Sequence, residues 1–236
     1  MPASAKPIRA VLFDFAGTLF ARQRAEREVA LAAATLGVAL SQPECERLGA
    51  QFLAAGMPGG PYPASIPDDV APIYAERDLG PDRHRAAYLA LLSSVPAPRG
   101  LAEAVYERVR TADGWIAYRD AQATIHALIE RDIAVALVSN VGFDLRPILN
   151  AYAMDQLALH ASLSFELGVA KPSPVIFEHA LASLDTVPED ALMVGDHPAA
   201  DGGAAAIGVR TLILPMSPPG SEHGLAQVLD LVLDAN

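Results

Sequence analysis

The sequence predicts an α/β fold: a doubly wound parallel sheet, flanked by helices and interrupted by an inserted α-helical domain. The first observation is a set of short apolar runs without polar alternation, which is typical of strands buried on both faces of a parallel sheet. The second is the alternation of such runs with helix-like segments after residue 120. The third is a long stretch, residues 20–117, that contains amphipathic segments but no convincing buried strand.

The predicted strands are short and consist mostly of β-branched or large apolar residues. The first covers residues 8–13 and is closed by Asp14. Runs of the same texture predict strands at 133–138, 191–194 and 210–214, and a weaker run predicts a fifth strand at 157–165. The helices expected between and after these strands cover residues 121–131, 143–152, 173–184, 199–207 and 221–233.

The inserted segment differs from the rest of the chain in composition. Its amphipathic stretches predict helices at residues 23–36, 43–55, 81–92 and 101–110, separated by Gly- and Pro-rich loops. We therefore expect a core formed by residues 1–19 and 118–236 and a helical domain formed by residues 20–117, with hinges near Phe20 and at 115–118. The insertion contains ten basic and twelve acidic residues, so most of the net negative charge belongs to the core.

The overall composition excludes several classes of protein. Apolar residues make up 52% of the 236 residues, charged residues 19%, and the formal net charge is −11. These values are typical of a soluble globular protein and argue against one that coats nucleic acid. The single cysteine, Cys45, excludes an intramolecular disulfide framework and a cysteine-ligated zinc site. Because no apolar run could span a membrane and residues 1–10 carry no apolar secretion signal, we expect a cytoplasmic monomer or homodimer without nucleic-acid or membrane partners.

Polar residues and one glycine follow three of the predicted strands. They are Asp14, Ser139, Asn140, Gly195 and Asp196. Ligands of open α/β sheets bind beyond the carboxyl ends of the strands, so these residues should face one crevice. Two more charged residues, Lys171 and Asp201, lie in the connecting segments. Each residue alone has an ordinary explanation as a turn, cap or surface residue, but their order and placement together indicate a functional site.

This ordered set resembles the haloacid dehalogenase-like hydrolase superfamily, and the resemblance covers most of the chain. It implies that Asp14, in the segment DFAGTL, is the aspartate nucleophile of the first motif, followed by the matching Gly17 and Thr18. It also implies a Rossmann-like core, with residues 20–117 as a helical cap of the C1 type.

The same resemblance implies roles for the later motifs. Ser139, with Asn140 beside it, would provide the hydroxyl of the second motif. Lys171, in VAKPSP, would be the lysine of the third. Asp196 would be the acidic residue of the fourth motif, and Asp201 would orient Lys171 or a metal-bound water.

These residue types suit the hydrolysis of a phosphate ester. A carboxylate that attacks phosphorus forms an acyl phosphate and divides one difficult displacement into two easier ones. Because two anions repel each other, a cation must neutralise them, and the resemblance implies Mg²⁺ bound by Asp14, Asp196 and the backbone carbonyl of Ala16. Lys171 and the hydroxyl of Ser139 would hold the phosphoryl oxygens as charge develops.

The expected substrate is a small anionic molecule. Arg22 and Arg24 are the basic residues that follow the first motif most closely along the chain. We expect the substrate to contact Gly17, Thr18, Asn140 and Arg22. The loop at residues 56–63 either contacts the leaving group, as caps of this type do, or is a plain surface turn. A second cluster either meets an anionic substrate or forms a solvated helix face; it consists of Arg83, His84, Arg85 and Tyr88.

One position departs from the family pattern. Phosphatases of this superfamily have a second aspartate two residues after the nucleophile, where this chain has Ala16. That aspartate protonates the leaving oxygen and then activates water, and such general acid–base catalysis contributes about 10²–10⁴-fold. Neither Phe15 nor Gly17 can replace it.

Three interpretations of Ala16 remain open. The enzyme either acts on a phosphorylated compound whose leaving group needs little protonation, or uses another acid such as His197, although His197 also fits an ordinary loop residue. Alternatively, it cleaves carbon–halogen bonds as 2-haloacid dehalogenases do, although these need no metal and lack the acid that Asp196 supplies here. A phosphonate hydrolase of this family would require a cap lysine, and residues 20–117 contain none. The third interpretation is a catalytically weakened relative that binds a ligand. We predict the first: a Mg²⁺-dependent hydrolase of a small phosphorylated metabolite.

Overall fold

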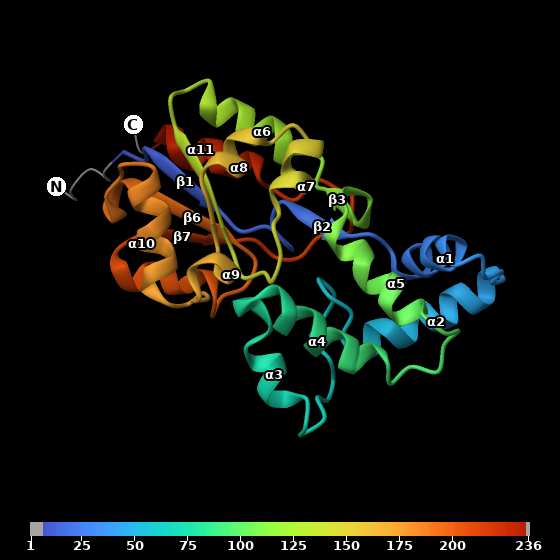
Figure 1. Cartoon of the computed structure of the whole chain (residues 1–236). Helices are drawn as coiled ribbons and strands as arrows, with labels where there is room; N and C mark the ends of the chain where they lie inside the picture. The colour runs from blue at the N-terminus through green and yellow to red at the C-terminus, as the bar shows by residue number, and fades with distance from the viewer. Residues whose placement is uncertain (1–6, 235–236) are drawn as a thin grey trace.

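The computed structural model describes residues 7–234. Its centre is a five-stranded parallel sheet in the order β5-β4-β1-β6-β7 (Figure 1). The strands are β1 (Ala10–Phe13), β4 (Ala134–Ser139), β5 (Ala161–Leu163), β6 (Ala191–Gly195) and β7 (Arg210–Ile213). Because β1 pairs with β4 on one side and β6 on the other, its carboxyl end lies in the middle of the sheet's edge. The predicted doubly wound α/β fold is confirmed.

Helices cover both faces of this sheet, which explains why its strands are apolar throughout. On one face, Val11 and Phe13 belong to an apolar cluster with α6 (Ala121–Ile129), α7 (Arg146–Ala151), α8 (Asp155–Leu159) and α11 (Ala226–Asp234). On the other face, Ala10 and Leu12 belong to a cluster with α10 (Pro174–Ser183) and the 3₁₀ helix η5 (Asp201–Ile207). Figure 1 shows α6 and α11 on the opposite side of the sheet from α10.

Two core segments differ from the sequence prediction. The weak fifth run forms only the three-residue strand β5, which is flanked by α8 and by α9 (Ser164–Leu167). The predicted helix at 199–207 starts two residues later and is a 3₁₀ helix. Its first turn contains Gly202 and Gly203, and glycine lowers α-helix propensity. A short 3₁₀ turn, η4 (Pro188–Asp190), precedes β6.

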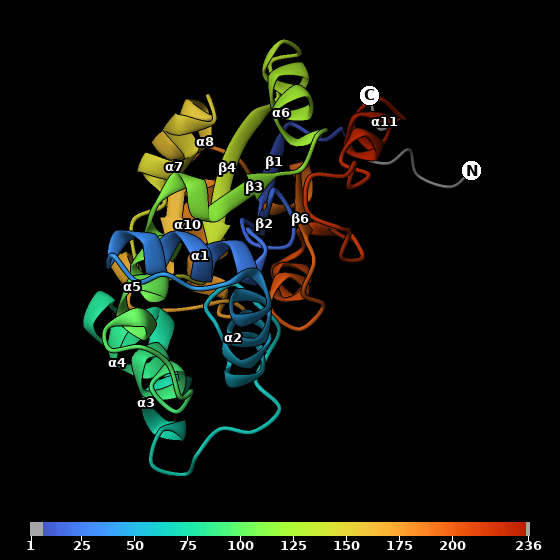
Figure 2. The ribbon, with the colours of Figure 1, turned by 90° about the vertical axis from the view of Figure 1, so that its right-hand side faces the viewer.

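The insertion is helical, as predicted, and lies beyond one end of the sheet, away from α6 (Figures 1 and 2). Its helices are α1 (Ala25–Thr35), α2 (Gln42–Ala55), α3 (Ala71–Ala75), α4 (Pro81–Leu92) and α5 (Leu101–Glu107). Short 3₁₀ turns connect them at η1 (Arg77–Leu79), η2 (Arg108–Arg110) and η3 (Ala112–Gly114). The five-residue α3 and the turn η1 had no periodic pattern that could predict them.

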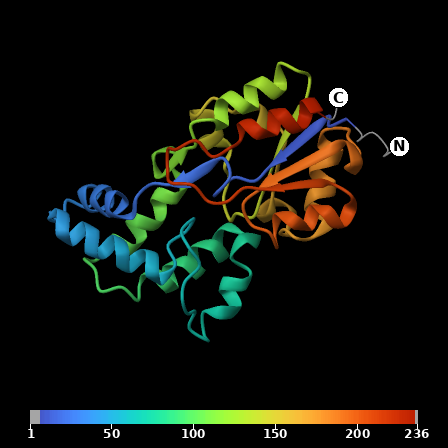
Figure 3. The ribbon, with the colours of Figure 1, turned by 180° about the vertical axis from the view of Figure 1, so that it is seen from behind.

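The sequence shows no convincing buried strand in residues 20–117, but the structure has two short, partly buried ones. Strands β2 (Phe20–Arg22) and β3 (Trp115–Ala117) pair antiparallel as a separate two-stranded ribbon. Figure 3, seen from behind, shows the blue strand β2 between the large sheet and the insertion. Three-residue strands are too short to produce a recognisable apolar period. Both predicted hinges fall in this ribbon, and we keep 19/20 and 117/118 as the proposed domain boundaries.

Among the described residues, no helix combines the length and the apolar character that crossing a membrane requires. The expectation that residues 1–10 carry no secretion signal lies partly outside the described residues, because the description starts at residue 7.

Candidate active site

Asp14 directly follows β1 and therefore lies at the middle of the carboxyl edge of the sheet. Its backbone N–H donates to the carbonyl of Val194 at 2.9 Å, which continues the pairing of β1 with β6. The Asp14 residue is only 7% exposed. The hydroxyl of the buried Thr18 lies 3.4 Å from Asp14 Oδ2, so the loop after β1 folds back onto the carboxylate.

Lys171 brings the separate motifs together. Its Nζ donates to Asp14 Oδ1 at 2.6 Å, to Asp201 Oδ1 at 2.7 Å and to the carbonyl of Val138 at 2.8 Å. An ammonium group has three N–H donors, and these three acceptors account for all of them. Burial opposes the charge, but the carboxylates of Asp14 and Asp201 outweigh it and raise the pKa of Lys171 above its ordinary value. Lys171 therefore stays protonated inside the protein.

Asn140 holds Lys171 in place through the backbone. Its Oδ1 accepts the N–H of Lys171 at 2.7 Å, and its Nδ2 donates to the carbonyl of Lys171 at 3.0 Å. The side-chain amide expected to bind substrate thus contacts the lysine backbone, although Asn140 also lines the cavity described below. Ser139 is buried at the end of β4 and, within the described part of the chain, is not among the cavity-lining residues.

Asp196 and Asp201 complete the acidic cluster. Asp196 follows β6 and is half-buried, whereas Asp201 is buried and accepts the backbone N–H of His197 on Oδ2 at 2.9 Å. A Cβ atom at Gly195 would collide with the Asp201 carboxylate, so glycine allows this close approach. One oxygen from each of Asp14, Asp196 and Asp201 lies within 4.8 Å of the other two.

This cluster carries an excess of buried negative charge. Three carboxylates face one ammonium group, so the site has a net charge of −2 when all groups are ionised. Burial raises the pKa of Asp14 to about 7, with Lys171 acting in the opposite direction. Burial and the neighbouring Asp201 also raise the pKa of Asp196. An all-oxygen, negatively charged donor set fits a hard divalent cation such as Mg²⁺, which would neutralise the excess charge.

Gly17 meets a backbone and a packing requirement at once. Its φ is +87°, and a Cβ atom there would collide with the Asp196 carboxylate. We expect Gly17→Ala to lower the free energy of unfolding by more than about 1 kcal/mol, because it combines left-handed strain with displacement of Asp196. We also expect weaker Mg²⁺ binding.

Gly37→Ala is the matched control for this prediction. Gly37 has a φ of +69° but no atom within 4 Å of an added Cβ, so it reports the backbone strain alone. Thermal unfolding and Mg²⁺ titration of both variants provide the comparison. The packing argument would be contradicted if Gly17→Ala and Gly37→Ala lost equal stability and Gly17→Ala bound Mg²⁺ as tightly as the wild type.

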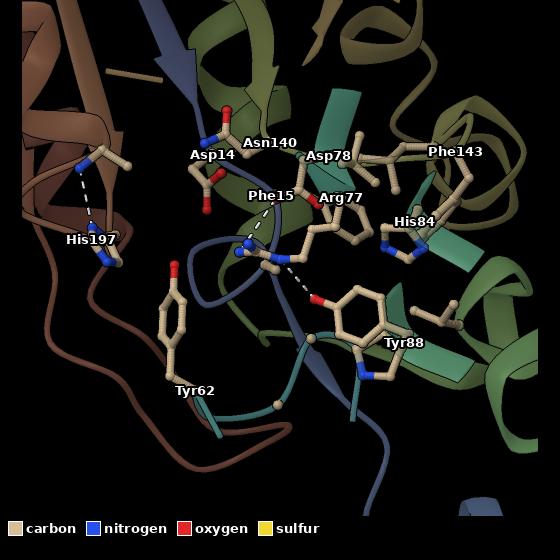
Figure 4. A pocket seen from close by; sticks show the side chains of 18 of the residues that line it. Asp14, Phe15, Tyr62, Arg77, Asp78, His84, Tyr88, Asn140, Phe143 and His197 are labelled. Carbon is tan, nitrogen blue, oxygen red and sulfur yellow. Dashed lines mark hydrogen bonds and ion pairs between the residues drawn. The ribbon is translucent and has the colours of Figure 1, made fainter. Parts of the chain in front are cut away.

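A cavity of about 220 Å³ opens in front of the carboxylates, between the sheet edge and the insertion (Figure 4). Core residues on its wall include Asp14, Ala16, Lys171, Asp196 and His197. Residues 57–62 of the Gly- and Pro-rich loop also line it. The loop thus forms part of the cavity wall.

Only part of the predicted basic cluster on α4 faces the cavity. His84 and Tyr88 are buried and line it. Arg83 and Arg85 are exposed and form ion pairs with Glu76 and Glu107, respectively. The two arginines therefore lie on a solvated helix face, and His84 and Tyr88 face the cavity.

Arg22 does not belong to the site, and its expected role in substrate binding is corrected here. Within the described chain it is not a cavity-lining residue. The side chain is buried, pairs with Glu28 at 3.0 Å and donates to the carbonyl of Gly114 at 2.9 Å. Its guanidinium also lies over the ring of Trp115. Proximity along the chain was misleading because strand β2 carries Arg22 into the base of the insertion.

The cavity arginine that the sequence did not indicate is Arg77. It lies on the three-residue turn η1, between α3 and α4, where no periodic pattern or motif marks it. Asp78 beside it also lines the cavity. The fold of the insertion places both residues in the cavity wall.

His197 occupies an exposed position on the cavity wall. Its Nδ1 accepts the backbone N–H of Ala200 at 3.1 Å, so the neutral ring carries its proton on Nε2. Its ring centre is 6.2 Å from that of Tyr62 in the opposing loop. His197 thus lines the same cavity as Asp14 and Asp196.

Comparisons with known proteins agree with this geometry. Residues 8–208 match a family model described as haloacid dehalogenase-like hydrolase. A phosphoserine phosphatase of Thermus thermophilus is 38% identical over 140 residues, which cover 56% of this chain and 54% of the relative. The chain therefore matches only about half the length of this curated relative.

Solved structures with the same fold include both phosphatases and dehalogenases. A phosphatase from Thermococcus onnurineus is 20% identical, with 95% of this chain and 98% of that chain covered and a TM-score of 0.58. A 2-haloacid dehalogenase from Pseudomonas syringae pv. Tomato DC3000 is also 20% identical (96% and 98% covered, TM-score 0.59). The magnesium-bound hydrolase YfnB from Bacillus subtilis is 19% identical (96% and 99% covered, TM-score 0.67). At these identities the likeness shows the fold alone.

Proposed function

Because this chain belongs to the haloacid dehalogenase-like hydrolase family, we propose that it hydrolyses a phosphate ester of a small metabolite through an aspartyl intermediate at Asp14. The observation that carries the proposal is the contact of Lys171 with both Asp14 and Asp201, beside Asp196. This arrangement offers a nucleophile, a fixed cation and an acidic metal site at one sheet edge. The phosphatase name of the Thermus relative supports the same reaction class.

The first step is attack by the Asp14 carboxylate on phosphorus. An Asp14 oxygen forms a bond to phosphorus, the bond from phosphorus to the leaving oxygen breaks, and its electron pair stays on that oxygen. The hydrogen bond from Lys171 to Oδ1 fixes the carboxylate orientation, and the ammonium charge stabilises the phosphoryl oxygens. In the second step, water attacks the acyl phosphate, which releases phosphate and restores the carboxylate.

The same cluster provides the residues that would bind the metal. Asp14, Asp196 and the backbone carbonyl of Ala16 would hold Mg²⁺, which neutralises the carboxylates and polarises the phosphoryl group when bound. Asp201 keeps its two oxygens on Lys171 and on the backbone of His197, and therefore acts as a support. Its hydrogen bond with Lys171 holds the ammonium group in place at the edge of the sheet.

The leaving oxygen must obtain a proton from a group other than residue 16. Ala16 lines the cavity but has no acidic group. His197 lies on the same wall, and its Nε2–H is available to donate a hydrogen bond to the leaving oxygen. The chain therefore suits esters whose alcohol leaves easily, or esters whose leaving oxygen His197 stabilises by this hydrogen bond.

Ala16 also favours a second candidate function, hydrolysis of a carbon–halogen bond at Asp14. A halide leaves without a proton, so this reaction does not need the missing aspartate. Against it stands the acidic cluster of Asp14, Asp196 and Asp201, whose excess charge suits a metal-dependent reaction.

A panel of phosphate esters and 2-haloacids, assayed with Mg²⁺ and with EDTA, tests the proposal. We expect phosphate release that requires Mg²⁺ and no halide release. Halide release that persists in EDTA would overturn the proposal in favour of dehalogenation. Binding of phosphate without turnover of any compound would favour the weakened, ligand-binding relative.

The charge of the site predicts a specific dependence of stability on pH. The pKa of Asp14 is raised from 3.8 to about 7, so between these values the folded state binds a proton that the unfolded state has released. Stability of the metal-free protein should therefore fall as the pH rises from about 4 to about 7. Thermal unfolding in EDTA at several pH values measures this slope.

Mg²⁺ and Asp14→Asn serve as controls for the pH prediction. The metal should raise the unfolding temperature more at pH 8 than at pH 5, because it competes with protons for the carboxylates. Asp14→Asn should flatten the slope in EDTA. An unchanged slope in this variant would show that other groups dominate the titration.

A further inference from the structure

In the described part of the chain, the insertion contributes one arginine, Arg77, to the lining of the cavity. Among the cavity-lining residues within 7–234, Arg77 is the only arginine and Lys171 the only lysine. We propose that Arg77 anchors a carboxylate on the leaving group, so that the substrates are phosphate esters of small hydroxy acids. This inference rests on the proposed phosphate ester hydrolysis.

Neighbouring groups hold the guanidinium of Arg77 in one orientation. Nε donates to the hydroxyl of Tyr88 at 3.3 Å, and Nη1 donates to the carbonyl of Tyr74 at 2.8 Å. The guanidinium carbon lies 4.2 Å from the ring centre of Tyr74 and 5.7 Å from that of Tyr62. The aromatic rings contact the faces of the guanidinium and do not occupy its edge. Of its five N–H donors, one on Nε and one on Nη1 are used by Tyr88 and Tyr74, so donors on the two Nη atoms remain for a carboxylate.

The ion pair with Asp78 leaves N–H donors of Arg77 available for a substrate carboxylate. Its Oδ2 lies 3.4 Å from Arg77 Nη2, longer than the 2.7–2.9 Å or so of a well-formed charge-assisted hydrogen bond. The carbonyl of Asp78 accepts a hydrogen bond from the Ser164 hydroxyl of the core at 2.6 Å. This contact fixes the turn η1 relative to the sheet, so the guanidinium is preorganised. Figure 4 shows Arg77 extending between Tyr88 and the Asp14 side of the cavity.

The core end of the cavity carries three carboxylates, which would repel a second negative group placed beside the phosphoryl group. At the insertion end, Arg77 offers the only guanidinium among the described lining residues. With a cavity of about 220 Å³, a small molecule can place its phosphoryl group at Lys171 and its carboxylate at Arg77.

Other arginines of the insertion are unsuited to this task. Arg22 is buried against Glu28 at the base of the insertion. Arg83 and Arg85 are exposed and pair with Glu76 and Glu107. Arg83 therefore provides a matched control for substitution of Arg77.

Two pairs of substrates that differ in one carboxylate test the proposal. They are O-phosphoserine with O-phosphoethanolamine, and phosphoglycolate with methyl phosphate. We expect wild-type kcat/KM to favour the carboxylate member of at least one pair by about 100-fold, as for a charged hydrogen-bonded contact. Arg77→Gln should lose about 100-fold on that member and less than about 3-fold on its partner, whereas Arg83→Gln should change neither.

Several outcomes would overturn the anchor. Equal losses on both members of a pair would assign Arg77 to phosphoryl binding or to structure, and a wild-type preference for the member without a carboxylate would exclude the proposed class. Arg77→Lys should recover part of the activity, because it restores the charge without the bidentate geometry. If Arg77→Gln fails to fold, Tyr88→Phe removes the Nε partner and should weaken only the carboxylate substrates.

The two proposals fail in different ways. If no ester releases phosphate, p-nitrophenyl phosphate included, the proposed hydrolase function is wrong. The anchor is then tested by calorimetric binding of O-phosphoserine and phosphoglycolate to wild type and Arg77→Gln in Mg²⁺. The anchor is supported if Arg77→Gln binds either compound about 100-fold more weakly than the wild type does. It is overturned if the two proteins bind both compounds with equal affinity.

Discussion

Substitution of Asp14 by Asn should abolish Mg²⁺-dependent phosphate release, with kcat reduced by at least about 10³-fold. The neutral amide cannot form the acyl phosphate and provides one fewer charged ligand for the metal. Phosphate release from the best ester of the panel measures the loss. Mass spectrometry of the quenched wild-type reaction should detect the phosphorylated protein, and the variant should lack it.

Folding of the Asp14→Asn variant separates loss of the nucleophile from loss of structure. The substitution lowers the excess negative charge beside Asp196 and Asp201, so the unfolding temperature in EDTA should stay the same or rise. Asp185→Asn is a suitable control, because Asp185 is exposed and its φ of 49° is one that Asn tolerates. Phosphate release that survives in Asp14→Asn would remove Asp14 as the nucleophile.

Restoring a carboxylate at residue 16 should have the second largest effect. Ala16 lines the cavity two residues after Asp14, so an aspartate there would place a carboxylate in the same cavity. We expect Ala16→Asp to raise kcat by about 10²–10⁴-fold on alkyl phosphates, the usual contribution of general acid–base catalysis. The gain should be small on p-nitrophenyl phosphate, since that leaving group departs without a proton.

Ala16→Asn provides the isosteric control for this gain. It fills the same space but cannot transfer a proton, so its activity should remain near that of the wild type. If Ala16→Asp shows no gain on alkyl phosphates, the missing proton donor does not limit the natural protein. An equal gain in Ala16→Asn would assign the effect to packing or hydrogen bonding.

Much of the core could be predicted because its physical signals are local. The buried strands β1, β4 and β6 consist of apolar runs. Asp14 and Asp196 directly follow β1 and β6, and Ser139 is the last residue of β4. The order of Asp14, Lys171 and Asp196 along the chain then indicated one site. Their contacts, such as Lys171 Nζ to Asp201 Oδ1, depend on side-chain geometry that the order of motifs does not contain.

The insertion was less predictable where short elements decide the geometry. Strands β2 and β3 have three residues each, and the turn carrying Arg77 also has three, so none of them shows a period. Chain distance favoured Arg22, which the antiparallel ribbon instead carries to Glu28. Long-range pairing therefore determined which arginine faces the cavity.

The pairing of β2 with β3 makes the whole insertion the loop of a single β-hairpin. Entropy of loop closure grows only logarithmically with length, by about 0.6 kcal/mol for each doubling. The sheet is therefore nearly indifferent to how many residues the hairpin loop contains, provided that Phe20 and Ala117 stay in register. A segment of another length between Arg22 and Trp115 should therefore leave β2 paired with β3.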